Sequence, residues 1–159
     1  LREDVDAFFA AHFEPSDRIL AVLCRGTDYT AQRPYGHPVQ PSLQEIFEET
    51  QATVRQHNIN KIFLSTEDAD ISRQFRSAFN SVTEFPGVTV SYNQGKLLYE
   101  SFTGSQKLRI VQRYLRQIET ISRCHHFIAG RCGGSLWAAL HSSAKQFGHV
   151  KIWDLGVYR

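Results

Sequence analysis

The amino-acid sequence predicts an α/β protein, in which a Rossmann-like, mostly parallel five-stranded sheet carries helices on both faces. Short apolar runs alternate along the chain with longer amphipathic segments, an order typical of strand–helix–strand units. Strands that are apolar throughout indicate a sheet that is buried on both sides. Because crossover connections are right-handed, few topologies fit this order, and a Rossmann-like sheet is the commonest of them.

The expected elements follow from these runs and from the turn residues between them. Breaks at Pro15–Ser16, Pro41–Ser42 and Pro86–Gly87 separate helical from extended segments. The expected strands cover residues 19–24, 61–65, 88–92, 126–129 and 150–155. The expected helices cover residues 2–13, 41–56, 69–79, 105–122 and 136–143. Residues 25–40 and 93–104 show neither the helical nor the strand period of apolar residues, so we expect long loops there.

The spacing of large side chains predicts which of them are buried. The long helix over residues 105–122 has an apolar face, made of Leu108, Val111, Leu115, Ile118 and Ile121. We expect Trp137 and Trp153 in the core. The neighbours His125 and His126 point in opposite directions along a strand, which argues against a metal site. The remaining histidines considered are expected at the surface: His12, His57, His141 and His149.

Length and composition suit a single domain over residues 1–159. The net charge of +2 is too small to indicate nucleic-acid binding, and no apolar run is long enough to cross a membrane. The three cysteines lack zinc-ligand spacing and no signal peptide is visible, so we expect free thiols and a cytoplasmic location. The chain has no methionine and begins at Leu1, which favours a piece of a longer protein; a eukaryotic parent would also allow the Golgi or ER lumen.

The first of three polar loops at strand ends is "RGTD", after the strand over residues 19–24. Ligands of open parallel sheets bind beyond the carboxyl ends of the strands. The planar fork of Arg25 suits a phosphate, Gly26 permits close approach of a ligand, and Asp28 could bond a sugar hydroxyl. The alternative is purely structural: Arg25 and Asp28 form an ion pair that closes the strand end.

The second loop is "STEDAD", residues 65–70. In the structural interpretation, Thr66 or Glu67 caps the helix that follows. In the functional interpretation, Asp68 or Thr66 contacts the base or ribose of a nucleotide.

The third loop is "GRCGGS", residues 130–135. Backbone N–H groups at Gly133 and Gly134 can face an anion at the start of a helix, and the Ser135 hydroxyl could join them. The loop is neither a P-loop nor a GxGxxG motif. Because the first and fourth strands are neighbours in a Rossmann-type order, this turn should lie beside Arg25. Two phosphate-suited features on adjacent loops indicate a diphosphate.

Four motifs in this order resemble the nucleotide-binding, C-terminal half of the GT-B fucosyltransferases. They are "VLCRGTDY" at 22–29, "GHP" at 36–38, "FLSTEDADI" at 63–71 and "ISRCHHFIAGRCGGSLWAAL" at 121–140. The sequence is most similar to the α1,6-fucosyltransferases, including the bacterial nodulation type, and more distantly similar to the protein O-fucosyltransferases. The resemblance covers roughly residues 18–155.

The resemblance implies a site for a GDP-sugar donor, GDP-fucose in the first place. Arg25 matches the arginine that holds the β-phosphate, and Gly133–Ser135 matches the turn that holds the diphosphate. Glu119, or Gln117 as the second choice, lies near the position that reads guanine. Further matches near the donor are Gly26, Asp28, His37, Thr66 and Asp68.

The same resemblance implies a glycosyltransferase that inverts the transferred sugar and needs no metal and no cofactor, with Arg25 and Asp28 as candidate catalytic residues. Its partners would be a glycan, lipid or protein acceptor and an acceptor-binding domain outside this chain. Three positions depart from the family: Leu23 replaces a histidine, Gly26 an arginine, and Arg33 an acid near the reaction centre. Two alternatives stay open: a non-catalytic nucleotide-sugar-binding or regulatory domain, and an unrelated hydrolase or phosphatase that uses Cys24 or Cys132.

Overall fold

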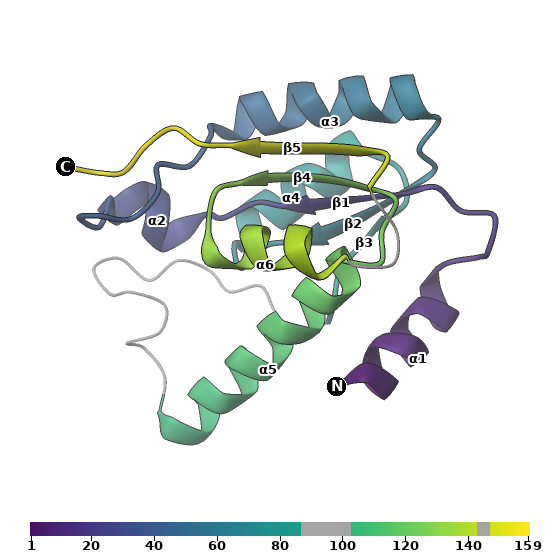
Figure 1. The fold of residues 1–159 in the computed structure, drawn as a ribbon, viewed down its shortest axis with the longest axis horizontal. Coiled ribbons are helices and arrows are strands. Elements are labelled where there is room, and N and C mark those ends of the chain that lie inside the picture. Colours follow the sequence, from purple (N-terminus) through teal and green to yellow (C-terminus); the bar gives the residue numbers. More distant parts are fainter. Residues whose placement is uncertain (87–102, 143–146) are drawn as a thin grey trace.

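A parallel sheet with the strand order β3-β2-β1-β4-β5 forms the centre of the molecule (Figure 1). Its strands are β1 (Ile19–Leu23), β2 (Lys61–Ser65), β3 (Val82–Thr83), β4 (His126–Gly130) and β5 (His149–Trp153). The computed structural model describes residues 1–86, 103–142 and 147–159, without the side chains of residues 27–29. All the pairings between these strands are parallel, which confirms the predicted Rossmann-like sheet.

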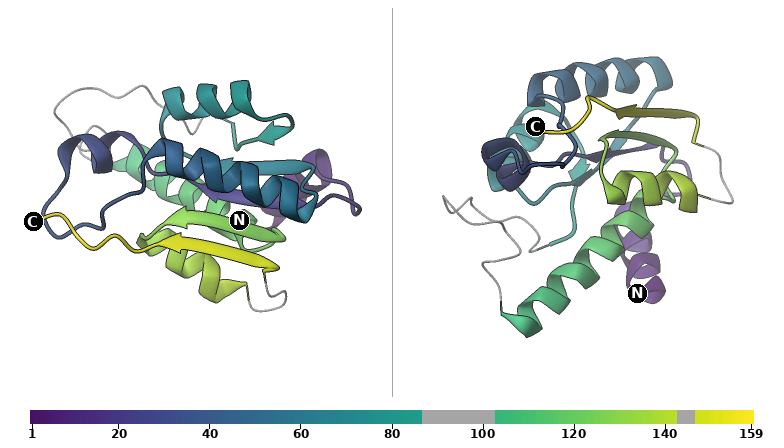
Figure 2. Two further views of the ribbon diagram at one scale, coloured as in Figure 1. Left: turned by 90° about the horizontal axis from the view of Figure 1, so that it is seen from above. Right: turned by 60° about the vertical axis from the view of Figure 1, so that its left-hand side comes forward.

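Helices cover both faces of this sheet (Figure 2). One face carries α1 (Arg2–His12), α5 (Gly104–Ile121) and α6 (Gly133–His141). The other face carries α3 (Leu43–His57) and α4 (Ala69–Ala78). Alternate residues of β1 enter the two cores, as the period of a strand requires, and all of β1 is buried.

Most of the predicted elements are present within two residues of their expected bounds. The exception among the matched helices is α6, which begins at Gly133 rather than Leu136 because the glycine-rich turn is itself helical. The edge strand β3 lies at Val82–Thr83, before the strand that was predicted over residues 88–92. Residues 88–92 themselves lie outside the described residues.

The prediction of an unbroken loop over residues 25–40 is wrong. A short helix, α2 (Thr27–Gln32), begins after Gly26 and ends at Arg33, whose φ of 45° is left-handed. A helix of six residues is too short to repeat an apolar face, so periodicity could not reveal it.

The prediction that the apolar stripe of α5 is buried along its whole length is also wrong. Ile118 and Ile121 are buried, but Leu108, Val111 and Leu115 are 60%, 44% and 44% exposed. The first half of α5 extends away from the sheet in Figure 1 and in the right-hand view of Figure 2, so no strand of the described residues lies beneath it.

Trp137 is likewise exposed, at 57%, rather than part of the core. The buried face of α6 is made of small residues, Gly134, Ser135 and Ala138, which leaves Trp137 on the outer side. Trp153 is partly buried and packs against the core on the α3 and α4 face. Among the helices of the described ranges, none is both long enough and apolar enough to cross a membrane.

Candidate functional site

Arg25 lies just beyond the carboxyl end of β1, where it meets a carboxylate from the neighbouring strand end. Its Nε atom is 3.6 Å from Oε1 of Glu67, which follows β2. The same Oε1 accepts a buried hydrogen bond of 3.0 Å from the backbone N–H of Gly26. The Arg25 and Glu67 side chains are only 18% and 10% exposed. The ion pair at this strand end therefore involves Glu67 and was not predicted from sequence.

Gly26 is required by the packing of α4. A Cβ atom at this position would lie 2.7 Å from Cβ of Asp68 and 2.8 Å from Cδ1 of Ile71. Asp68 caps α4, because its Oδ1 accepts hydrogen bonds of 2.8 Å and 3.2 Å from the N–H groups of Asp70 and Ile71. The second loop thus caps α4, but the prediction that Thr66 or Glu67 is the capping residue is wrong, because Asp68 takes this position.

Cys24 and Thr66, the residues that directly follow β1 and β2, are buried. Thr66 is 3% exposed, and its hydroxyl accepts a hydrogen bond of 3.2 Å from the Asp68 N–H. Burial, with the nearby charges of Glu67 and Asp68, raises the pKa of the Cys24 thiol far above its usual range. Cys24 is therefore a poor source of thiolate, which argues against its use as a nucleophile.

The glycine-rich turn forms the first turn of α6. Cys132 is the residue before the helix, and its N–H donates to the Ser135 hydroxyl at 2.9 Å. That hydroxyl donates in turn to the Cys132 carbonyl at 2.9 Å, and Ser135 is completely buried. The Ser135 side chain therefore fixes the turn, and its contact with a diphosphate stays a prediction. Gly133 is exposed and faces open space.

Tyr114 of α5 packs against the glycine-rich turn, near the charge of Arg25. A Cβ atom at Gly134 would collide with the Tyr114 hydroxyl, which lies 4.0 Å from Sγ of Cys132. Burial raises the pKa of Tyr114 above its usual range; the nearby Cys132 adds to the rise, and the positive charge of Arg25 opposes it. Arg25, Glu67, Tyr114 and the turn over residues 132–135 thus form one cluster, which we call the carboxyl-edge site.

Sequence reasoning missed Tyr114, although a signal was present. Tyr114, Ile118 and Ile121 are spaced i, i+4 and i+7 on α5, which places them on one side of the helix. Ile118 and Ile121 are the two isoleucines of α5 that the sheet buries.

The backbone beside His37 is held by the C-terminal segment. The N–H of Tyr158 donates to the His37 carbonyl at 2.9 Å, and the N–H of Val39 donates to the Gly156 carbonyl at 3.0 Å. The Gln40 amide donates to the Arg131 carbonyl at 2.9 Å, which ties this segment to the end of β4. We call residues 156–158 the C-terminal strap. It keeps His37 in the segment that borders the carboxyl ends of β4 and β5, a role for the last residues that sequence did not predict.

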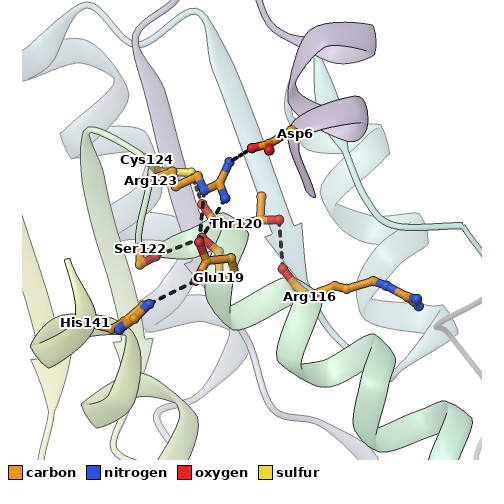
Figure 3. Close-up of polar contacts among 8 residues, drawn as sticks. All are labelled: Asp6, Arg116, Glu119, Thr120, Ser122, Arg123, Cys124 and His141. Carbon is orange, nitrogen blue, oxygen red and sulfur yellow. Dashed lines mark hydrogen bonds and ion pairs between the residues drawn. The ribbon is translucent and has the colours of Figure 1, made fainter. Parts of the chain in front are cut away.

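Glu119 belongs to a different part of the molecule (Figure 3). Its Oε1 accepts hydrogen bonds from Arg123 at 3.1 Å and 2.9 Å, and its Oε2 lies 3.0 Å from Nε2 of His141. Arg123 also pairs with Asp6 of α1. Glu119 therefore links α5 to α1 and α6 near the end of α5 that leads into β4, and the structure does not bring it to Arg25.

Gln117, the second choice for the guanine contact, is buried against the carboxyl end of β2. Its Oε1 accepts a hydrogen bond of 2.9 Å from the hydroxyl of Ser65, the last residue of β2. The side chain of Asp28, within α2, lies outside the described residues. The guanine contact and the role of Asp28 stay predictions.

The carboxyl-edge site has the chemistry of an anion site. A guanidinium lies on one strand end, and the first turn of α6 lies on the next strand end, where N–H groups lack partners within the helix. Within residues 1–86, 103–142 and 147–159, no group of three or more His, Cys, Asp or Glu side chains is placed to hold a metal ion.

Solved fucosyltransferases have this fold. Fucosyltransferase NodZ from Bradyrhizobium is 17% identical, with a TM-score of 0.56 over 87% of this chain and 40% of the NodZ chain. POFUT1 in complex with GDP is 11% identical, with a TM-score of 0.62 over 95% of this chain and 45% of the POFUT1 chain. NodZ soaked with GDP-fucose is 18% identical, with a TM-score of 0.53 over 87% of this chain and 40% of that chain. The chain therefore has the fold of part of these fucosyltransferases.

This result confirms the resemblance found in the sequence at the level of the fold. The chain spans less than half the length of these NodZ and POFUT1 structures. No protein-family model matches the sequence, and no curated protein sequence matches it either.

Proposed function

We propose that this domain binds the nucleoside diphosphate of a GDP-sugar, GDP-fucose in the first place, and serves as the donor-binding part of a glycosyltransferase. The observation that carries the proposal is that Arg25 and the first turn of α6 follow the carboxyl ends of the neighbouring strands β1 and β4, with Tyr114 packed against that turn. NodZ co-crystallized with GDP or soaked with GDP-fucose, and POFUT1 in complex with GDP, have this fold, which supports the choice of nucleotide.

The proposed chemistry is an inverting transfer that needs no metal. The leaving group is a nucleoside diphosphate, whose negative charge grows as the bond to the sugar breaks. A guanidinium and the N-terminal turn of a helix can stabilise that charge together. An acceptor hydroxyl on a glycan, lipid or protein would attack, and we assign the acceptor-binding surface to a second domain.

Calorimetric titration tests the nucleotide. We expect GDP to bind more tightly than UDP or ADP, and the Arg25→Ala variant to lose most of this affinity. The control is Arg76→Ala, which removes an exposed arginine that is paired with Glu84, and it should leave the affinity unchanged. UDP or ADP binding as tightly as GDP would overturn the choice of guanine.

A second candidate function is nucleotide-sugar binding without transfer. Two described carboxylates near Arg25 already have structural roles: Glu67 bonds Gly26, and Asp68 caps α4. Arg33, at the position where related enzymes have an acid, ends α2. Release of GDP from GDP-fucose, measured with the acceptor-binding domain and candidate acceptors present, separates the two functions, because a binding domain would retain affinity for GDP and release none.

A further inference from the structure

Three histidines from different elements stack at the amino edge of the sheet, opposite the carboxyl-edge site. His57 ends α3, His126 begins β4 and His149 begins β5. The ring centroids of His57 and His126 are 4.4 Å apart, and those of His57 and His149 are 5.5 Å apart. We call these three residues the histidine stack. The expectation that His57 and His149 are simple surface residues is therefore wrong.

The interior of the histidine stack suits neutral rings. His126 is 8% exposed. Among the described residues, neither Nδ1 of His126 nor Nε2 of His57 has a hydrogen-bond partner, and both atoms are buried. A neutral imidazole has one nitrogen that only accepts, whereas the protonated ring has two donors that need acceptors. Protonation of the stack would thus bury a charge without a matching acceptor.

Arg18 and His125 lie around the inner rings of the histidine stack, and a carboxylate contacts its outer ring. Arg18, just before β1, donates from Nη1 to the His57 carbonyl at 3.0 Å. His125 lies beside the stack, and its Nδ1 accepts from the Ile19 N–H at 3.1 Å. Glu49 of α3 contacts the outer ring, with Oε1 at 3.2 Å from Nε2 of His149. Burial, followed by the other histidines and Arg18, lowers the pKa of His126 from 6.5 to about 4.

β5 connects this edge of the sheet to the carboxyl-edge site. At the amino end, the N–H of Gly148 donates to the His125 carbonyl at 2.8 Å. At the other end, the Trp153 carbonyl accepts from the Arg131 N–H at 2.9 Å, and the C-terminal strap follows directly. β5 is at the edge of the sheet and pairs with β4. A change that loosens β5 can therefore reach residues 36–39.

We propose that the histidine stack is a pH-sensitive latch, which holds β5 and the C-terminal strap at neutral pH and releases them as the pH falls. The sign follows from the depressed pKa of His126. The unfolded chain binds a proton more readily than the folded one, so the stabilisation is fully present above the usual pKa of 6.5 and is lost as the pH falls toward 4. The latch is independent of the proposed nucleotide, because no ligand takes part in it.

Amide hydrogen exchange tests the latch. Protection factors, which remove the intrinsic pH dependence of exchange, are compared at about pH 7.5 and about pH 5. We expect the amides of β5 and of the C-terminal strap to lose about tenfold in protection at the lower pH. Amides of α4, which connects β2 to β3 at the opposite end of the strand order from β5, should lose much less protection. Unchanged protection of β5, or an equal loss in α4, would overturn the proposal.

Two variants assign the effect to the histidines. His126→Leu removes the buried ring that titrates, so the protection of β5 should no longer depend on pH in this range. His57→Leu removes a neighbouring ring and serves if the first variant does not fold. The control is His12→Gln, which removes an exposed histidine of α1 and should behave as the native chain does. A histidine-stack variant with the native pH dependence would contradict the latch.

Discussion

Arg25 is held between a buried carboxylate and the proposed diphosphate site. Its side chain is only 18% exposed and is paired with Glu67. Because Glu67 also fixes the Gly26 N–H, this single carboxylate positions both the guanidinium and the backbone at the end of β1. Removal of Arg25 should therefore affect binding and folding through separate causes.

Arg25→Ala should lower GDP affinity by roughly ten- to a hundred-fold, the effect of losing a charge-assisted contact of about 1.5–3 kcal/mol. The free energy of unfolding should also fall, by about 1–3 kcal/mol, because Glu67 keeps its charge without the arginine. Arg25→Lys should restore affinity only in part, since an ammonium lacks the planar fork. Calorimetry and urea unfolding of the same proteins measure both quantities.

The double variant Arg25→Ala with Glu67→Gln separates the two causes. The amide oxygen of glutamine can still accept from the Gly26 N–H, and no unpaired charge remains. Stability should therefore recover while GDP affinity stays low. Recovery of both would show that Arg25 serves only the fold.

The position of Arg25 at the carboxyl end of β1 was predictable because an arginine directly follows an apolar strand; its role as a site residue stays a prediction. Its partner Glu67 was not predictable, because the pair joins two strand ends separated by 42 positions, and three acids in "STEDAD" were equivalent in sequence. Only the register of β1 against β2 selects Glu67 among them.

The start of α6 depends on one glycine but not on its neighbour. Gly134→Ala should lower the free energy of unfolding by about 1–3 kcal/mol, because the new methyl group meets the Tyr114 hydroxyl and Ile118. Gly133→Ala is the matched control: its Cβ would face open space, so stability should be unchanged or slightly higher. Thermal unfolding of both variants measures the difference.

Tyr114→Phe tests the cause of the Gly134→Ala effect. Phenylalanine lacks the hydroxyl that the alanine methyl would meet, so the double variant should regain part of the lost stability. If Tyr114→Phe and Gly134→Ala are simply additive, the two residues are not in the contact described here.

Glu119 lies in a network between helices, and this gives it a role that differs from guanine recognition. Glu119→Gln should lower the free energy of unfolding by about 1–3 kcal/mol, since Arg123 loses a charged partner. Arg123→Gln breaks the same contacts and should cost a similar amount. GDP affinity should be unchanged in both variants. A loss of GDP affinity with unchanged stability would instead support the guanine contact that the sequence resemblance implies.

Elements with a strong local signal were predicted, and those that depend on their surroundings were not. β2 was correct at both ends because a run of apolar residues lies between polar turns. α2 was missed because a helix of 6 residues is too short to show an apolar repeat. The stripe on α5 was predicted correctly as helical, but periodicity does not show whether a sheet lies beneath Leu108, which is 60% exposed among the described residues.

The two edges of the sheet carry different chemistry. Guanidinium and backbone N–H groups gather at the carboxyl edge, where a parallel sheet presents its loops for ligands. Imidazoles gather at the amino edge, where β4 and β5 begin. β5 and the C-terminal strap are the continuous segment between these edges, so nucleotide binding at one and protonation at the other can influence the same residues.

In the domain as a whole, we assign the positive charge at the carboxyl-edge site to Arg25 and the first turn of α6, and this assignment predicts the response to chelation. If Arg25 and the first turn of α6 neutralise the diphosphate, GDP should bind with the same affinity in EDTA as in magnesium or manganese. Calorimetric titration of the native chain under these three conditions measures this, with Arg25→Ala as the variant that must bind weakly in all of them. Binding that disappears in EDTA and returns with either metal would contradict the prediction, since a bound cation would then supply the charge that we assign to Arg25.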